Sequence, residues 1–468
     1  MGIVDWHNIP GDYYDYTQTW QPEAPYNFDY SQTLTMKLCN AIQDGKGSSK
    51  VFCSFEDALE IIRRVDTITR GIPKIIYLVG WQYCGHDDKY PAMDEVNVHL
   101  KRPQDATARE SLLWLMEEAR RYNTTVSLHI NLKDSYTDSP LWAEYVEKGV
   151  IGRNADGSLF EIGTWAGKKS YQIDYKAEWE SGLLQRRVDR LLAMLPIQKA
   201  GTIHVDAYHC NEFAGTTLDE QRRYRRKAIR YFHALGVDVT TEFVYSCPKD
   251  DRGALPEDLA VSQKEDLVGL VPMIWHFNPP REWYITHPRQ LICGGRYNPG
   301  LDPKHEKALG FLGGDSIHGE GSFQLYRDAD PKAWERSFLS EFALNVPAWY
   351  CQNRLRLLEL RGEGDAAQAV YEQGYMVKAK NRVITQNGHL LREGGDVFMP
   401  LVWRTGEYLA YSENGCENRQ WHWSGGMRID CFVLSDEGWR RVEGRVSLDD
   451  ESLRLSLRPR EALLIRER

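Results

Sequence analysis

Short apolar runs alternate with amphipathic stretches through the middle of the chain. The runs Thr125–Leu132, Thr202–Tyr208 and Val237–Phe243 are rich in β-branched and aromatic residues and predict buried strands. Between such runs, apolar residues recur three and four positions apart, as over residues 184–195, which predicts helices with one buried face. Strands that alternate with helices in this way predict a sheet of parallel strands.

The number of apolar runs predicts the fold class. Eight such strands in an α/β chain indicate a (β/α)8 TIM barrel. We expect its strands at residues 74–80, 125–132, 169–175, 202–208, 237–243, 267–277, 308–314 and 345–351.

The pattern changes near residue 372. From there, short segments with alternating polar and apolar residues are separated by Gly, Asn and Asp, which is typical of an antiparallel β-sandwich. We therefore expect an N-terminal arm packed on the barrel over residues 1–50, the barrel over residues 51–371 and a small all-β sandwich domain over residues 372–468.

Composition limits the classes of partner. The net charge of −9 argues against a nucleic-acid partner, and no 18-residue apolar run predicts a membrane helix. The nine cysteines are scattered without a CxxC pair, and the start of the chain lacks the pattern of a signal peptide. We expect free thiols and a cytoplasmic protein. The sequence gives no indication of the oligomeric state.

Two carboxylates end successive predicted strands. In a TIM barrel the active site lies at the C-terminal ends of the strands, where Asp206 and Glu242 are placed. Neighbouring strands lie roughly 4.8 Å apart, so both carboxylates can face one small substrate. Such a pair is the equipment for acid/base or nucleophilic chemistry on a glycosidic bond.

Other polar and aromatic residues fall at the same end of the predicted barrel. Polar groups at the ends of apolar strands are costly unless they are satisfied, and several that converge on one rim indicate a binding site. Flat aromatic side chains there would stack on a sugar or wall its pocket. We expect substrate contacts from Trp81, His86, Asp87, His129, Asn131, Asp174, Tyr208, Trp275, His276 and Asp315.

Metal catalysis is the main chemical alternative. Metal-dependent barrel hydrolases commonly carry an HxH pair on the first strand, and the run at residues 74–80 contains no histidine. No phosphate-cradling or nucleotide-binding motif follows a strand. We therefore expect neither a metal nor another cofactor. A barrel that binds a carbohydrate without cleaving it is a further alternative.

Several segments resemble glycoside hydrolase families 101 and 129. The motif HVDAYH at residues 204–209 and TTEF at residues 240–243 resemble the strands that carry the nucleophile and the acid/base in these families. HINLKDSY at residues 129–136 and GHDDKYP at residues 85–91 are similar to their second strand and substrate-binding loop. The resemblance covers roughly residues 74–320.

This resemblance implies a retaining enzyme that cleaves α-linked N-acetylgalactosamine from a carbohydrate. It also implies that Asp206 is the nucleophile and Glu242 the general acid/base. Another α-glycosidase specificity, such as α-galactoside, stays open.

Overall fold

The computed structural model describes residues 4–242, 267–275, 285, 307–314, 316–449 and 451–468. The chain forms two compact units. Unit 1 comprises residues 1–30, 35–61 and 74–277, and unit 2 comprises residues 31–34, 62–73 and 278–468. Each unit is described separately below.

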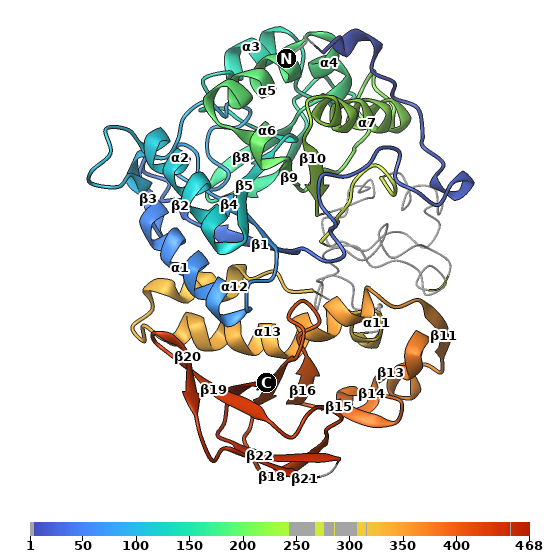
Figure 1. Ribbon diagram of the computed structural model, residues 1–468. Helices are drawn as coiled ribbons and strands as arrows, with labels where there is room; N and C mark the ends of the chain where they lie inside the picture. Colours follow the sequence, from blue (N-terminus) through green and yellow to red (C-terminus); the bar gives the residue numbers. More distant parts are fainter. Residues whose placement is uncertain (1–3, 243–266, 276–284, 286–306, 315, 450) are drawn as a thin grey trace. The chain divides into compact units, whose positions relative to one another are not determined.

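A parallel sheet forms the centre of unit 1 (Figure 1). Its strands, in spatial order, are β1 (Leu34–Cys39), β4 (Lys74–Val79), β5 (Thr124–Asn131), β9 (Thr202–Asp206) and β10 (Asp238–Thr241). The pairs β4–β5, β5–β9 and β9–β10 are all parallel. The α/β class with a parallel sheet is therefore confirmed.

Strand β1 comes from the segment that the sequence predicts to be an arm. The amide of Leu34 donates to the carbonyl of Pro73, and the amide of Asn40 donates to that of Val79. Because the offset between donor and acceptor stays constant, β1 runs parallel to β4. All six residues of β1 are buried, so the expected arm contributes a full strand to the sheet.

The sheet is strongly curved. A flat sheet of five strands would hold its two outer strands roughly 19 Å apart. Lys37 on β1 nevertheless forms an ion pair with Glu242, which directly follows β10. Thr35 on β1 also contacts Met273, next to the bridge that pairs Ile274 in parallel with Thr241. This curvature is typical of a barrel, although the described residues do not show closure.

Amphipathic helices connect these strands. The longer ones are α1 (Phe55–Ile68), α2 (Ala108–Glu118), α5 (Leu183–Met194) and α7 (Leu218–Ala234). Helix α7 begins at a capping box in which Thr217 and Glu220 each bind the other's backbone amide. The short helices of this unit are α3 (Trp142–Glu147), α4 (Tyr175–Glu180) and α6 (Ile197–Ala200).

Three predicted barrel strands are wrong. The run at 169–175 gives β8 (Lys168–Gln172), which belongs to a separate antiparallel sheet with β6 (Asp134–Tyr136) and β7 (Glu161–Trp165). The runs at 308–314 and 345–351 lie in helices α11 (Lys307–Gly313) and α13 (Ala333–Gln352). Periodicity alone cannot separate a short buried strand from a buried piece of helix. The run at 267–277 is described only to residue 275, where it forms isolated bridges.

Antiparallel sheets dominate unit 2. A ten-stranded sheet has the order β11-β12-β13-β14-β15-β16-β17-β23-β19-β20, and a three-stranded sheet has the order β18-β22-β21. The strands begin at Leu357, before the expected boundary at residue 372. Their bounds are β11 (Leu357–Arg361), β12 (Gln368–Tyr371), β13 (Tyr375–Lys378), β14 (Val383–Gln386), β15 (His389–Glu393), β16 (Asp396–Pro400), β17 (Glu407–Ser412), β18 (Cys416–His422), β19 (Ile429–Ser435), β20 (Gly438–Val442), β21 (Val446–Asp449), β22 (Ser452–Leu457) and β23 (Glu461–Glu467).

One apolar core joins the two sheets of unit 2. It contains Phe398 and Leu463 from the large sheet and Trp421 and Leu453 from the small one. Side chains from both sheets fill the space between them, as in a β-sandwich.

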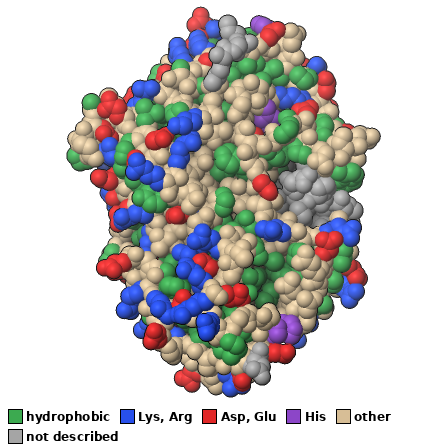
Figure 2. Space-filling model, in the orientation of Figure 1, with side chains coloured by type: hydrophobic (Ala, Val, Ile, Leu, Met, Phe, Trp, Pro, Cys, Tyr) green, Lys and Arg blue, Asp and Glu red, His purple; other side chains and the backbone are tan. Residues whose placement is uncertain are grey.

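The described residues also show the state of the thiols and the distribution of charged side chains. The seven described cysteines are all free thiols. On the face shown in Figure 2, acidic side chains lie among the basic ones. No helix within the described residues is long and apolar enough to cross a membrane.

Candidate active site

Asp206 and Glu242 lie side by side at the C-terminal edge of the parallel sheet. Strands β9 and β10 pair in parallel with Val205 opposite Thr241. Asp206 and Glu242 are the next residues along the two strands, so they occupy neighbouring positions at the strand ends. Both side chains are 13% exposed, so each carboxylate is mostly buried but still reachable from solvent.

Each of these carboxylates faces a basic side chain from another strand. Oδ2 of Asp206 lies 3.3 Å from Nε2 of His129 on β5. Glu242 Oε1 forms an ion pair with Nζ of Lys37 on β1. The side chains of His129 and Lys37 are only 2% and 3% exposed, so both basic groups are buried where they contact the carboxylates.

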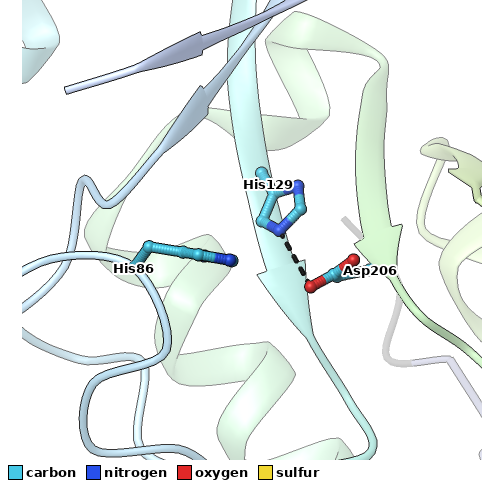
Figure 3. A group of neighbouring side chains, drawn as sticks. All are labelled: His86, His129 and Asp206. Carbon is cyan, nitrogen blue, oxygen red and sulfur yellow. Dashed lines mark ion pairs between the residues drawn. The ribbon is translucent and has the colours of Figure 1, made fainter. Parts of the chain in front are cut away.

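His86, His129 and Asp206 form a compact group (Figure 3). His129 and Asp206 project from neighbouring strands, and the His86 ring points toward them from the loop after β4 (Figure 3). One possible ligand atom of each residue lies within 4.8 Å of the other two. The sequence predicts all three residues at the same end of the sheet but does not predict them as a set of metal ligands. Two imidazoles and a carboxylate are ligands that suit zinc.

Asp87 is a buried acid beside this group. Its Oδ2 lies 3.2 Å from Nε2 of His86, and its backbone adopts a left-handed conformation with φ of 55°. Burial raises the pKa of Asp87 to about 7; the charges of Asp206, Asp134 and Glu242 add to the rise, and His86 opposes it. Three other carboxylates are therefore close enough to act on Asp87.

Two more buried groups have shifted protonation equilibria. Burial raises the pKa of Asp134 to about 6; Lys133 opposes the rise and Asp206 adds to it. Burial, and then the charge of Lys37, lowers the pKa of His129 well below 6.5. At neutral pH, His129 therefore presents a neutral imidazole to Asp206.

Aromatic rings form the layer of the sheet interior below these carboxylates. The ring of His204 lies 4.8 Å from that of Trp275 and 5.4 Å from that of Tyr77, between centroids. Trp81 is fully buried and donates from Nε1 to the carbonyl of His129 at 3.0 Å. Trp81 and Trp275 are thus packed inside the fold, and neither has an exposed ring face on which a sugar could stack.

Asp174 is occupied by the fold. One of its carboxylate oxygens, Oδ1, accepts from the amides of Lys176 and Ala177 and so caps α4. The same oxygen accepts from Gln221 at 2.7 Å, and Oδ2 accepts from the hydroxyl of Thr216 at 2.6 Å. These bonds give Asp174 a structural role, in contrast to the expected substrate contact.

Asn131 and Tyr208 also serve the local fold. Oδ1 of Asn131 accepts from the amides of Lys133 and Asp134 and fixes the turn after β5. The ring of Tyr208 is buried and packs edge-to-face on Tyr175, at 5.2 Å between centroids. Neither arrangement directs the residue at a substrate.

Two predicted site residues are not described, and one residue of the described site is not predicted. His276 and Asp315 lie outside the described residues. Lys37 is brought into the site although the sequence does not predict it. The available signal is a single charge inside the apolar run LTMKLC at residues 34–39, because a lysine in a fully buried strand needs a partner.

Comparison with protein families finds a similarity to one family of glycoside hydrolases. Residues 41–252 match the model of glycoside hydrolase family 101, described as endo-alpha-N-acetylgalactosaminidase. The resemblance to this family is therefore confirmed, and the matched range includes both Asp206 and Glu242. No curated protein matches the sequence.

Solved structures with the same fold include alpha-N-acetylgalactosaminidase NagBb from Bifidobacterium bifidum. The ligand-free form is 12% identical with a TM-score of 0.53, and the match covers 76% of this chain and 57% of that one. The complex with Gal-NHAc-DNJ is 13% identical with a TM-score of 0.51, and the match covers 77% and 59%. The chain thus spans less than two thirds of the length of these proteins. At this identity the likeness establishes the fold alone.

Proposed function

We propose that the protein is a retaining α-glycosidase that acts on α-linked N-acetylgalactosamine. The observation that carries the proposal is the placement of Asp206 and Glu242 directly after the paired residues Val205 and Thr241. Retaining glycosidases need two carboxyl groups about 5–5.5 Å apart, a spacing that neighbouring strand ends can supply. The family match and the activity named for NagBb support the choice of sugar.

In the first step, Asp206 acts as the nucleophile and Glu242 as the acid. A carboxylate oxygen of Asp206 forms a bond to the anomeric carbon while the bond from that carbon to the leaving oxygen breaks. The carboxyl proton of Glu242 passes to the leaving oxygen, which departs as an alcohol. The sugar is then held on Asp206 as an ester.

In the second step, water replaces Asp206. Glu242, now a carboxylate, removes a proton from water as the water oxygen bonds to the anomeric carbon. The ester bond to Asp206 breaks and the carboxylate is restored. Two inversions at one carbon give retention of the anomeric configuration.

The remaining groups of the site would bind the sugar. Oδ1 of Asp87 is buried and has no hydrogen-bond partner among the described residues, so a sugar hydroxyl can satisfy it. His86 and His129 offer ring nitrogens beside it. His276 and Asp315 stay predicted contacts. We also propose that the curved sheet closes into the expected (β/α)8 barrel.

The test is Asp206→Asn, assayed with nitrophenyl α-glycosides of N-acetylgalactosamine, galactose and glucose. The variant keeps the shape of the side chain, so kcat should fall by about 10³-fold or more without loss of folding. Asp189→Asn, on α5, is the matched control, and it should keep near-normal turnover. Proton NMR of the first product should show the α-anomer. Near-normal activity of Asp206→Asn, or a β-anomer as first product, would refute the proposal, and hydrolysis of the galactoside alone would change the sugar.

A metal-dependent hydrolase is the second candidate, favoured by the grouping of His86, His129 and Asp206. The two candidates exclude each other in the role of Asp206, which cannot be both metal ligand and nucleophile. Mass spectrometry of the intact protein during turnover of a slow fluorosugar substrate separates them. A sugar ester on Asp206 supports the glycosidase, and its absence with metal-dependent turnover supports the alternative.

A further inference from the structure

We infer that Lys37 is a positioning residue that holds the acid/base Glu242 in its reactive orientation. The inference rests on the proposed function. Lys37 lies in the middle of β1, and its side chain is 3% exposed. Its Nζ forms the ion pair with Oε1 of Glu242.

Stability of the strand does not by itself explain a buried charge at this position. Residues 34–39 are all buried, and burying an ammonium group removes it from water at a cost that its partner only roughly offsets. An apolar side chain of similar length would fill the same volume. A buried ion pair is weak evidence for stability, so its location beside the proposed acid/base is the informative property.

The ammonium group has a second neighbour besides Glu242. It lies 5.2 Å from the ring centroid of Trp275, in a cation–π arrangement. The amide of Trp275 in turn donates to the carbonyl of Thr241, the residue before Glu242. Lys37, Trp275 and the end of β10 therefore form one connected assembly around the Glu242 carboxylate.

This assembly can fix which oxygen of Glu242 meets the substrate. With Oε1 held by Lys37, the proton transfer in the proposed mechanism is left to Oε2. Proton transfer depends on the alignment of donor and acceptor, and a misplacement of about 1 Å can cost on the order of 10²-fold in rate. The role predicts a specific kinetic signature, because help from an acid matters most when the leaving group is poor.

The experiment compares Lys37→Met and Lys37→Arg with the unmodified protein on two aryl α-N-acetylgalactosaminides. Dinitrophenol leaves without protonation, whereas phenol needs it. For Lys37→Met we expect kcat/KM to fall at least about tenfold more on the phenyl than on the dinitrophenyl substrate. Lys37→Arg should recover part of that difference, since it restores a cation beside Glu242. The ratio between substrates does not depend on the fraction of folded enzyme.

Lys74→Met is the matched control, because Lys74 is also a buried strand lysine but begins β4 at the opposite end of the sheet. Its substrate ratio should equal that of the unmodified protein. Equal losses on both substrates in Lys37→Met, or no loss, would overturn the positioning role while leaving the glycosidase intact. If the unmodified protein cleaves neither substrate, the proposed function fails, and the inference fails with it.

Discussion

The two units bury carboxylates in opposite electrostatic settings. In unit 2, Glu407 is 5% exposed, and Arg70 contacts both of its oxygens at 2.8 Å while Arg466 lies 3.0 Å from Oε1. Burial alone would raise the pKa of Glu407, but these two arginines outweigh burial and hold it below its ordinary value. In unit 1, Asp87 and Asp134 are buried among other carboxylates, and their pKa values rise to about 7 and about 6.

This difference distinguishes an acid that stabilises the fold from an acid that serves an active site. A carboxylate surrounded by cations is fixed in one charge state and serves the fold. Carboxylates gathered with too few cations retain protons near neutral pH and destabilise the local structure, an arrangement that is common in active sites. Changes at Glu407 should therefore affect stability alone, and changes at Asp87 should affect activity alone.

The largest effect on stability is expected from Glu407→Ala. The substitution leaves Arg70 and Arg466 without their buried partner, so the free energy of unfolding should fall by about 3–5 kcal/mol. Denaturant unfolding measures this loss, and kcat of the folded fraction should not change. Glu437→Ala, in the exposed turn between β19 and β20, is the control and should stay within about 0.5 kcal/mol. A similar loss in both variants would mean that the arginines do not stabilise unit 2 through Glu407.

Asp87→Asn should show the opposite pattern. It removes a charged acceptor that we assign to the sugar, so kcat/KM should fall by about 10–100-fold. The melting temperature should not fall, because a buried acid is replaced by a neutral group of the same shape.

The neighbouring Asp88 sharpens this test. Its Oδ2 accepts from the amide of Cys84 at 3.0 Å, and its Oδ1 pairs with Lys168 at 2.5 Å. Asp88→Asn should therefore lose about 1–3 kcal/mol of stability and little activity. Reversed phenotypes in the two variants would show that Asp87 serves the fold and Asp88 the substrate.

The sequence predicts the chemistry of the strand ends better than the number of strands. Asp206 and Glu242 stand out because each follows a compact β-branched run, and parallel strands put such ends together. β1 escapes prediction because Lys37 interrupts its apolar run.

The predicted strands at 308–314 and 345–351, which lie in helices α11 and α13, are wrong for a different reason. In α13, Trp334, Phe338, Phe342 and Val346 recur at every fourth position, a helical period that starts before the predicted run. A window confined to 345–351 sees only consecutive apolar residues. Similarly, nothing local in the sequence distinguishes Asp174, which caps a helix, from an acid that faces a substrate, because its partners Thr216 and Gln221 lie about 40 residues away.

A smaller effect should appear in the pH dependence of stability. The pKa of Asp134 is about 6 in the folded protein and about 3.9 in an unfolded chain, so the folded state binds its proton more tightly. The stability that this group contributes is therefore fully present below about pH 4, and it is lost as the pH rises through about 6, by about 1–3 kcal/mol. Urea unfolding at several pH values should show a flatter profile for Asp134→Asn. Parallel profiles for the two proteins would contradict the burial of an uncompensated acid.

The smallest effect is expected from removing metal ions. If Asp206 is the nucleophile, its carboxylate must be open to the anomeric carbon, so dialysis against a chelator should change kcat/KM by less than about twofold. A cation held by His86, His129 and Asp206 would add positive charge beside the carboxylates of unit 1. If the chelator removes activity and zinc restores it, the carboxylates of unit 1 are compensated by a cation, as Glu407 is by its arginines. The raised pKa values of unit 1 would then describe only the metal-free protein.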